Sequence, residues 1–337
     1  MEHKLKIGLI GYGKLGTIHA KNIAGSGKAI LYAVCDINAD ALERAKNDHG
    51  AETFTKIDDF LNMPLDGVVI STSTSQHLEN IIKIAKKNIP IFTEKPIGLT
   101  LQKTDEVLMV LSEAKIPLQI GFQRRWDPRY VELKRVIDSG EIGNPVLMKA
   151  FGRDTDASNP SNWGLEKNGG LFLNAAIHDY DLARYLFGQD IIKLSASGDA
   201  VVHKDLKNVF DVDTCSTTLF LKDGSIAMTE WSRYAAYGYD AEVEVVCTEG
   251  AIRIGKEYMS PLTVIHKNQM APTVYEVFAD AFKAEIEGFI KSIAEKIPMS
   301  PGIEDARIAL QIALLARSSY ENNSHLISVP TLKPITS

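Results

Sequence analysis

The stretch LKIGLIGYGKLG at residues 5–16 decides how the first part of the chain is expected to fold. An apolar run from Leu5 to Gly11 leads into glycines at 11, 13 and 16, and a helical pattern follows directly. In such a turn the first glycine permits a tight bend, the second lets a pyrophosphate approach the backbone, and the third lets the helix pack closely. The free amides and the dipole at the start of the helix favour phosphate groups. The motif therefore predicts a dinucleotide site that includes Gly11, Tyr12, Gly13, Lys14, Leu15 and Gly16.

Asp36 supports this interpretation, because it ends the second predicted strand, 20 residues after Gly16. A carboxylate at this place accepts hydrogen bonds from the hydroxyl groups of a ribose and repels a 2′-phosphate. We therefore expect NAD rather than NADP as the cofactor. The alternative is a purely structural glycine turn, with Asp36 as an ordinary strand-end residue.

Up to residue 123, short apolar runs alternate with helical patterns. The runs are apolar on both faces, which is typical of a parallel sheet covered by helices on both sides. Residues 1–123 are therefore expected to form a doubly wound, Rossmann-type α/β domain. The predicted strands are Leu5 to Gly11, Ile30 to Asp36, Gly67 to Thr72, Ile89 to Thr93 and Pro117 to Gly121, with helices such as Asn38 to His49 and Gln76 to Asn88 between them.

From residue 124 onward the pattern is that of a second, α+β domain spanning 124–337. Long runs alternate between polar and apolar residues and are joined by turns at Asp223-Gly224 and Glu249-Gly250, which is typical of antiparallel strands. We expect a large, mostly antiparallel open sheet. The predicted elements are a helix from Pro128 to Ile137, a meander of Asp213 to Leu221, Ser225 to Tyr234 and Ala241 to Ile254, helices at Val274 to Ala294 and Glu304 to Tyr320, and a last strand at 325–330.

The composition points to a small-molecule partner. The 337 residues carry a formal net charge of -6, so the chain has no global basic field for nucleic acid or an anionic membrane. It has no run of 18 apolar residues and no signal region at its start, which favours a cytoplasmic protein that does not enter a membrane. Cys35, Cys215 and Cys247 lie in apolar runs and are expected to be reduced core thiols.

Lys95 is the first candidate for chemistry outside the glycine turn. It follows Glu94 at the carboxyl end of a predicted parallel strand, the edge at which open α/β sheets bind their ligands. Pro96 favours an extended backbone at Lys95, which would project its side chain from a fixed position. A solvated lysine without a function is the alternative, and the residues alone do not choose between the two.

A polar cluster in the segment NAAIHDYD is the second candidate. Asn174, His178 and Asp181 are spaced by four and three residues and would share one face of a helix. The alternative is a polar helix start, with Asn174 as the cap and His178 as a satisfied partner. A metal site of His178, Asp179 and Asp181 is disfavoured, because neither a second histidine at the required spacing nor a cysteine pair accompanies them.

Several motifs taken together resemble the Gfo/Idh/MocA family, the glucose-fructose oxidoreductases and inositol dehydrogenases. The likeness spans nearly the whole chain, and GFQRR with YGYD is most similar to the inositol 2-dehydrogenase branch. The motifs are GYGKLG at 11, Ser71-Thr72 with His77, EKP at 94, GFQRRWDP at 121, GEIG at 140, GGLFLNAAIHDYDLARYLFG at 169 and YGYDAEVEVVCTEG at 237.

The resemblance implies NAD(P)-dependent oxidation of a secondary hydroxyl of a cyclitol or sugar, such as myo-inositol. It implies that Lys95 and His178 are catalytic, with Asn174 beside them, and that Arg125 and Tyr237 bind the substrate. It further implies a homo-oligomer, a tetramer or a dimer, formed through the open sheet. Ser71, Thr72, His77, Glu94 and Lys95 would join the glycine turn in binding the cofactor.

The chain departs from the family pattern at Asn174, where an aspartate is usual, and in the segment 154–168. An amide can only hydrogen-bond, whereas a carboxylate would also raise the pKa of a neighbouring histidine. Two alternatives therefore stay open. One is an NAD(P)H-dependent reductase of a keto-sugar, and the other is a dinucleotide-binding sugar sensor without turnover.

Overall fold

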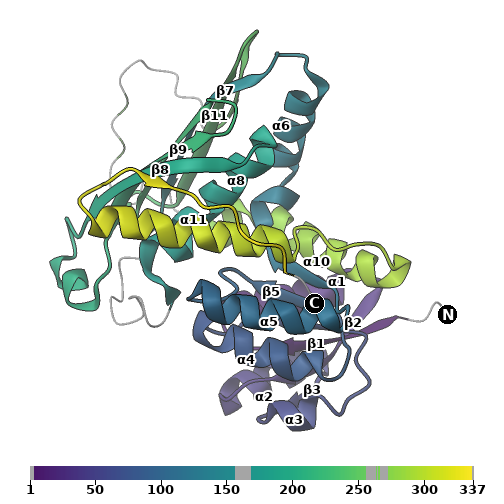
Figure 1. Ribbon diagram of the computed structural model, residues 1–337. Coiled ribbons are helices and arrows are strands. Elements are labelled where there is room, and N and C mark those ends of the chain that lie inside the picture. The colour runs from purple at the N-terminus through teal and green to yellow at the C-terminus, as the bar shows by residue number, and fades with distance from the viewer. Residues whose placement is uncertain (1–3, 156–167, 256–262, 264, 266–271, 336–337) are drawn as a thin grey trace. The chain divides into compact units, whose positions relative to one another are not determined.

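The computed structural model describes residues 4–155, 168–255, 263, 265 and 272–335 (Figure 1). Within these residues the chain forms two compact units. The first comprises residues 1–123, 280–307 and 333–337, and the second comprises 124–279 and 308–332. The units differ from the two continuous segments expected from the sequence, because residues 280–307 return to the first unit. A helical pattern shows that a helix forms but does not say which sheet it will cover.

The first unit contains a parallel sheet, sheet A, in the order β3-β2-β1-β4-β5-β6. The doubly wound architecture is confirmed, and the strand missed by the sequence patterns is β3, which has only three residues. The strands are β1 (Leu5–Ile10), β2 (Ala29–Cys35), β3 (Glu52–Phe54), β4 (Gly67–Ile70), β5 (Ile91–Glu94) and β6 (Leu118–Gly121). The helices are α1 (Lys14–Gly25), α2 (Ala39–His49), α3 (Ile57–Phe60), α4 (Thr74–Ala85), α5 (Leu101–Glu113) and α10 (Ala279–Glu295).

The register of the central strands positions the glycine turn. Ile10 at the end of β1 pairs with Cys35 of β2 and with Ile70 of β4. The three strands therefore end at one level, and the residues that follow them lie side by side at the carboxyl edge of the sheet. The strand order reverses at β1, between β2 and β4, which is where open α/β sheets form a ligand crevice. Ile286, Phe289 and Ile290 of α10 pack into the core of this sheet.

The second unit contains a mixed sheet, sheet B, in the order β12-β11-β7-β10-β9-β8-β13. Every neighbouring pair is antiparallel except β7 and β10, so the prediction of a mostly antiparallel open sheet is confirmed. The strands are β7 (Pro145–Arg153), β8 (Ile191–Asp199), β9 (Thr214–Leu221), β10 (Ile226–Ser232), β11 (Asp240–Cys247), β12 (Ala251–Ile254) and β13 (Ile327–Ser328).

The predicted meander is wrong at its third strand. β9 and β10 form a hairpin as expected, but β11 pairs with β7, which lies between it and β10. The run from Ala241 to Ile254 is also two strands, β11 and β12, that meet at the predicted Glu249-Gly250 turn. Alternation of polar and apolar residues indicates a strand with one buried face, but it does not identify the neighbouring strand.

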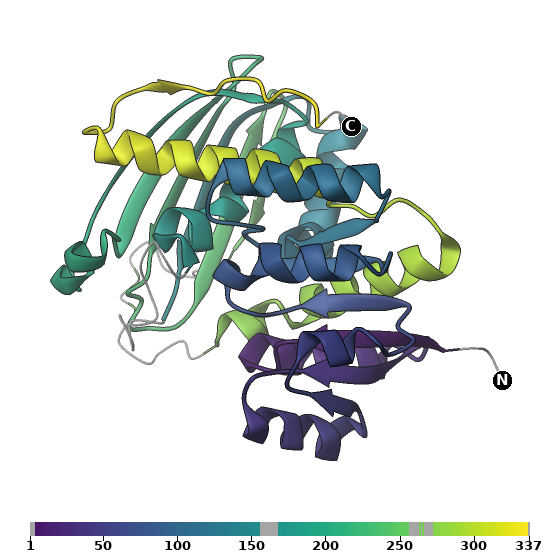
Figure 2. The same ribbon diagram turned by 60° about the horizontal axis from the view of Figure 1, so that its bottom comes forward.

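One face of sheet B is covered by helices (Figure 2). Side chains of this sheet such as Met148 and Trp231 are buried. The elements of this unit are η1 (Gln123–Trp126), α6 (Pro128–Ser139), η3 (Phe172–Ala176), α8 (Ile177–Phe187), η4 (Lys204–Val209), α9 (Val274–Val277) and most of α11 (Ile303–Glu321). The helix predicted from Val274 to Ala294 is broken at Phe278, which separates α9 from α10. Among the described residues, no helix combines the length and the apolar character needed to cross a bilayer.

Candidate functional site

The glycine turn between β1 and α1 has the geometry that phosphate binding requires. Gly11 has φ +92°, and a Cβ there would lie 2.6 Å from the carbonyl oxygen of Ser71. A Cβ at Gly16 would lie 2.0 Å from the carbonyl oxygen of Gly11, so this position also has no room for a side chain. A Cβ at Gly13 would meet nothing within 4 Å, which leaves open space beside the first amides of α1. The turn therefore offers a cradle into which a pyrophosphate fits.

The Asp36 carboxylate is held in place beside this turn. One of its oxygens accepts a hydrogen bond of 2.6 Å from the backbone N–H of Tyr12, and the other accepts one of 2.8 Å from the N–H of Asn38. Gly11 is tied to the end of β2 by its own N–H, which donates to the carbonyl of Cys35 over 2.8 Å. The acidic group is thus fixed at the end of β2, where a ribose diol would meet it.

A cavity of about 410 Å³ lies at this edge of the sheet. Its volume is within the range of small-molecule and cofactor sites. The predicted residues that line it are Gly11, Gly13, Asp36, Ser71 and Thr72. The cavity is also lined by residues that were not predicted from the sequence, namely Ile10, Cys35, Ile37, Thr55, Ile57, Ser73, Gln76, Glu79, Asn80 and Lys83. Gln76, Asn80 and Lys83 recur at helical spacing after the Ser71-Thr72 strand end, and this pattern could have predicted that they line the cavity.

The other predicted cofactor residues of the first unit have different surroundings. His77 is buried, and its ring nitrogens contact the carbonyl oxygens of Pro96 and Thr72 at 3.0 and 3.1 Å. Burial lowers the pKa of His77, so the ring is neutral near neutral pH. Through these two contacts His77 bridges the backbones that follow β4 and β5. The Glu94 carboxylate lies 2.8 Å from Nε2 of His19, and Lys95 follows at the end of β5.

In the second unit, His178 lies in the first turn of α8, directly after the π-helical turn η3. Its side chain is buried, whereas Asn174 is partly exposed. The start of this helical segment is fixed by Asp211, whose carboxylate accepts a 2.8 Å hydrogen bond from the N–H of Leu171 and contacts Arg233 over 2.7 Å. Asn174 does not occupy the cap position predicted as an alternative, because it lies inside η3 and Ala176 precedes α8.

Asp179, next to His178, joins a buried network. Its two oxygens accept hydrogen bonds from Arg124 and from the indole N–H of Trp231. The Arg124 guanidinium also lies 5.7 to 5.8 Å from the ring centroids of Trp231, Tyr130 and Phe278. Burial is the largest single influence and lowers the pKa of Arg124, but the Asp179 charge together with Tyr130 and Tyr239 outweighs it, so the pKa is raised and Arg124 stays a cation. This ion pair connects η1, α8 and β10 and fixes the backbone on one side of His178.

Asp181 forms a second buried ion pair, with Arg125. The contact is bidentate, with hydrogen bonds of 2.8 and 2.6 Å from the guanidinium to the two carboxylate oxygens, and the guanidinium lies 4.9 Å from the ring centroid of Tyr185. Asp181 thus turns toward η1. Of the three residues predicted to share one helical face, His178 and Asp181 lie in α8 and Asn174 lies in η3, and Asp181 is paired with Arg125.

Comparisons with known proteins cover almost the whole chain. Residues 5–122 match the model of the oxidoreductase family with an NAD-binding Rossmann fold, and residues 130–253 match the GFO/IDH/MocA C-terminal domain. The chain is 32% identical to the myo-inositol 2-dehydrogenase of Thermotoga maritima over 94% of this chain and 96% of that protein. It is 34% identical to the scyllo-inositol 2-dehydrogenase (NAD(+)) of Bacillus subtilis, over 96% of both chains.

The chain belongs to the Gfo/Idh/MocA family. A solved structure, the scyllo-inositol dehydrogenase of Lactobacillus casei with bound NAD(H) and scyllo-inositol, agrees with this conclusion. It superposes with a TM-score of 0.85 at 29% identity, and the match covers 97% of this chain and 99% of that chain. The sequence-based assignment to the family and to its two-part α/β architecture is therefore confirmed, as is NAD as the cofactor.

Within the Gfo/Idh/MocA framework the predicted site residues fall into two groups. The glycine turn, Asp36, Ser71, Thr72, His77, Glu94 and Lys95 belong to the first unit, whereas Arg125, Asn174, His178 and Tyr237 belong to the second. Tyr237 lies between β10 and β11 and is partly exposed. The unusual segment 154–168 is largely outside the described residues, since only residues 154, 155 and 168 of it are described. The roles of these residues remain predictions.

Proposed function

We propose that this protein is an NAD-dependent dehydrogenase that oxidises a secondary hydroxyl group of an inositol or a similar cyclitol to the ketone. The observation that carries the proposal is the similarity, over nearly the full chain, to two inositol 2-dehydrogenases. The dinucleotide cradle at Gly13 and the fixed Asp36 carboxylate support it independently, because they suit NAD and disfavour a 2′-phosphate.

The reaction divides between the cofactor and the side chains. When bound, NAD accepts the hydrogen of the substrate C–H bond together with its electron pair. His178 takes the proton of the hydroxyl group, because an imidazole is the side chain best suited to act as a base near neutral pH. Lys95 donates a hydrogen bond to the reacting oxygen and stabilises its growing negative charge. Asn174 orients a neighbouring hydroxyl group, and Arg125 and Tyr237 contribute to substrate binding.

The buried ion pairs support this division of roles. Arg125 is 11% exposed in its side chain, and its charge is already compensated by Asp181. We therefore expect Arg125 to donate hydrogen bonds to uncharged hydroxyl groups rather than to bind an anionic substrate. This role suits an uncharged cyclitol. Asp179 is fully buried and bonded to Arg124 and Trp231, so its role is to hold the helix that carries His178.

The test is NADH formation by the purified protein with NAD and a panel of myo-, scyllo- and chiro-inositol and common aldoses. Turnover with one inositol well above the aldoses is the expected result. His178→Ala should lower kcat by about 10²- to 10⁴-fold, the usual contribution of a general base, and leave NAD binding unchanged. Binding of NAD without turnover of any compound in either direction would contradict the proposal and favour a sensor, and turnover only of keto compounds with NADH would favour a reductase.

Asn174→Asp is the informative change for substrate identity. An aspartate restores the usual residue of the family and adds a negative charge close to His178 in sequence, which favours the protonated imidazole. If Asn174 adapts the site to a substrate other than myo-inositol, the variant should gain activity on myo-inositol and lose activity on the best substrate of the unaltered protein. Equal loss on all substrates would show that Asn174 has no part in selectivity.

The proposal extends to a cytoplasmic homo-oligomer, a tetramer or a dimer, formed through sheet B. The three cysteines are buried free thiols, which suits a reducing compartment. The face of sheet B opposite its helices carries a hollow of about 1020 Å³, lined by Phe151 and Met228 among charged side chains such as Lys149, Glu242 and Arg253. Light scattering on the purified protein tests this extension, and a monomer at micromolar concentration would contradict it.

A further inference from the structure

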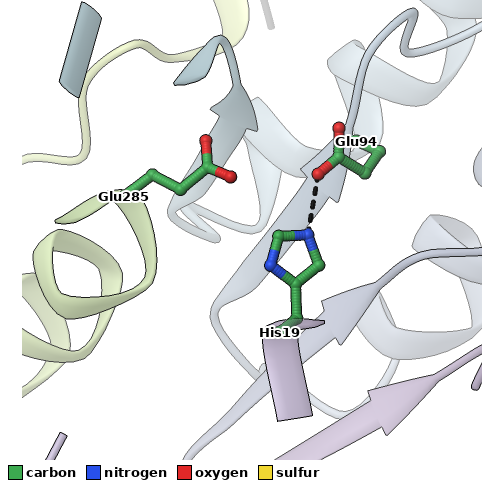
Figure 3. Close-up of side chains that lie close together, drawn as sticks. All are labelled: His19, Glu94 and Glu285. Atoms are coloured by element: carbon green, nitrogen blue, oxygen red, sulfur yellow. Dashed lines mark hydrogen bonds and ion pairs between the residues drawn. The ribbon is translucent and has the colours of Figure 1, made fainter. Parts of the chain in front are cut away.

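Three ionisable side chains meet in the interior of the first unit, one from each of three elements (Figure 3). His19 comes from α1, Glu94 from the end of β5, and Glu285 from α10. His19 and Glu285 are 0% exposed and Glu94 is 7% exposed. Each contributes a polar atom within 4.8 Å of those of the other two. Buried carboxylates this close together cannot both be ionised at low cost, so the distribution of protons in this cluster is decided by its hydrogen bonds.

The hydrogen bonds distinguish the two glutamates. Glu94 Oε1 lies 2.8 Å from Nε2 of His19, whose ring is held edge-on between Phe92 and Phe282. Neither carboxylate oxygen of Glu285 has a hydrogen-bond partner among the described residues. Charge on Glu285 would therefore be buried without a hydrogen bond to stabilise it, whereas charge on Glu94 is stabilised by its contact with His19. Burial, followed by the charge of Glu94, raises the pKa of Glu285 well above its usual value.

Glu94 is also fixed in position. A Cβ at Gly121, on the neighbouring strand β6, would lie 2.8 Å from Oε2 of Glu94, so the carboxylate occupies the space that a side chain would take. The backbone of α10 is tied to the same strand, since the Gln119 amide donates to the carbonyl of Glu285 over 2.8 Å. The carboxylate therefore has little freedom to move relative to the end of β5.

We propose that this His19–Glu94–Glu285 cluster holds one negative charge, on Glu94, and that this charge keeps the adjacent Lys95 as an ammonium group in the dehydrogenase. Glu285 is the neutral acid that completes the cluster, and its neutrality leaves the charge on Glu94 alone. In this assignment Glu94 does not contact the cofactor but is a positioning residue that acts through Lys95. The inference rests on the proposed function, in which Lys95 donates a hydrogen bond to the reacting oxygen.

The charged groups around Lys95 agree with this assignment. The Lys95 charge lowers the pKa of both Glu285 and His77, although burial has the larger effect on each of them. His77 is neutral because burial lowers its pKa, and its ring nitrogens contact backbone carbonyl oxygens. His19 on α1 is the partner of Glu94. Among these groups Glu94 is the anion nearest to Lys95 in the chain, and its removal leaves the ammonium without this compensation.

The test compares Glu94→Gln with Glu285→Gln, two variants that keep the shape of the side chain. The readout is the rate at which Lys95 reacts with acetic anhydride as a function of pH, followed by peptide mass spectrometry, because only the neutral amine reacts. Glu94→Gln should move the midpoint of this curve to lower pH by about one unit, a typical effect of a neighbouring opposite charge. Glu285→Gln should leave the midpoint where it is, because an amide replaces a neutral acid.

Kinetics give the second readout, which would not change if Glu94 had a purely structural role. In Glu94→Gln the alkaline limb of the kcat profile should shift to lower pH together with the labelling curve, while KM for NAD stays within about twofold. Equal labelling curves for Glu94→Gln and the unaltered protein would overturn the inference, and so would a shift in Glu285→Gln. If Glu94→Gln does not fold, a shift of the labelling curve in Glu285→Gln still overturns the inference.

Metal binding is the outcome that would replace this inference. A rise in Tm on addition of Zn²⁺ or Mn²⁺ that is lost in Glu285→Gln would show that a cation, rather than a proton, is shared by the cluster, and would overturn the assignment of a neutral Glu285. No change in Tm with either ion supports it. The labelling experiment requires no turnover, so its result is separate from the substrate panel. An unaltered protein that turns over no inositol contradicts the proposed function alone.

Discussion

The cavity beside the glycine turn of the first unit and the His178 helix of the second unit fix their polar groups by different means. Around the cavity, Asp36 is held by backbone amides of Tyr12 and Asn38, and the turn itself is shaped by positions where a side chain has no room. Around the helix, side chains hold one another across long stretches of sequence, as Arg124 holds Asp179 and Arg233 holds Asp211. One site depends on backbone shape and the other on buried charge.

This difference predicts how each site fails. A backbone-shaped site tolerates changes that leave the turn intact, because the groups that bind the ligand are main-chain amides. A site held by buried ion pairs loses stability when one partner is removed, because the other charge is left without compensation. Substitutions in the first unit should therefore separate binding from stability, whereas those in the second should affect both.

The largest expected effect is on the Arg124–Asp179 pair. Asp179→Ala leaves the Arg124 cation buried, with 2% of the residue exposed, and without its carboxylate. The free energy of unfolding should fall by about 3 to 5 kcal/mol, measured by urea denaturation. The control is Glu132→Ala, which removes an ion pair with Arg135 on the surface and should change nothing measurable. A loss equal to that of the control would show that buried charge does not hold this helix.

The glycine turn offers a matched pair of substitutions. Gly16→Ala places a methyl group 2.0 Å from a backbone oxygen and should lower the stability by about 2 kcal/mol or more. Gly13→Ala meets nothing in the protein, so Tm should stay the same, but the methyl group would occupy the space of the pyrophosphate and weaken NAD binding by about tenfold. Thermal unfolding and NAD titration of both variants check this. Equal Tm values would remove the distinction between the two glycines.

Asp36→Asn tests the basis of cofactor selectivity. The amide oxygen still accepts a hydrogen bond from one of the two backbone amides, but the charge that repels a 2′-phosphate is gone. The ratio of kcat/KM for NAD to that for NADP should fall by about tenfold, equal to about 1.4 kcal/mol, with little change in Tm. A ratio that stays constant would mean that shape, rather than the Asp36 charge, excludes NADP.

The smallest expected effect concerns Asn38, which caps α2. Its side chain accepts hydrogen bonds from the amides of Asp40 and Ala41, while its own N–H holds Asp36. Asn38→Ala removes the cap but keeps the N–H, so the stability should fall by about 1 kcal/mol and the NAD affinity should not change. Reduced NAD affinity at unchanged stability would show that the side chain, as well as the backbone, shapes the cavity.

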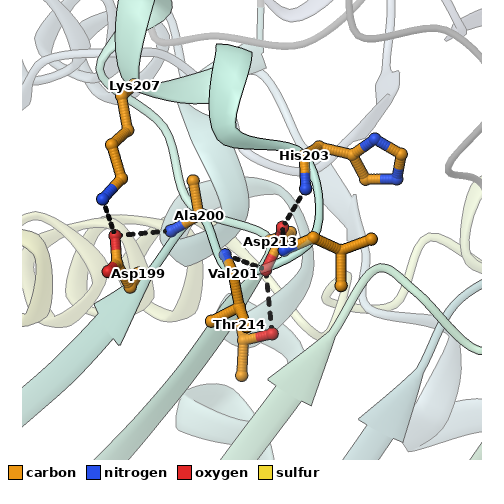
Figure 4. A network of polar contacts seen from close by, with 8 residues as sticks. Asp199, Ala200, Val201, His203, Lys207, Asp213 and Thr214 are labelled. Atoms are coloured by element: carbon orange, nitrogen blue, oxygen red, sulfur yellow. Dashed lines mark hydrogen bonds and ion pairs between the residues drawn. The ribbon is translucent and has the colours of Figure 1, made fainter.

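A network of hydrogen bonds around Asp213, in the second unit, shows why such stability effects extend beyond the site. Asp213 accepts hydrogen bonds from three successive backbone amides at Val201–His203 and from the hydroxyl of Thr214, and Asp199 contacts Lys207 (Figure 4). The backbone amides that face the Asp213 carboxylate lower its pKa, although burial opposes them. This aspartate fixes the connection between β8 and β9, as Asp211 fixes the segment before η3.

The geometry around the glycine turn follows from local sequence more directly than the ion pairs around His178 do. The glycine turn, Asp36 and the Ser71-Thr72 strand end follow one another within short distances along the chain, and the parallel strands before them end at one level. Arg124 pairs with Asp179 and Arg125 pairs with Asp181, over separations of 55 and 56 residues. The sequence contains many other oppositely charged residues that could have been their partners. Helical spacing predicted one polar face for Asn174, His178 and Asp181, but it did not predict that Asp181 pairs with Arg125.

The sequence by itself determined the two-part α/β architecture, the cofactor class and the glycine turn after the first strand, because these depend on local spacing of apolar residues, glycines and one carboxylate. Only the tertiary structure decided that β7 separates β10 from β11, that α10 packs on sheet A, and that Glu285 meets Glu94 and His19. These outcomes depend on which surfaces bury one another, and the free energy of that burial belongs to contacts between segments rather than to any single segment.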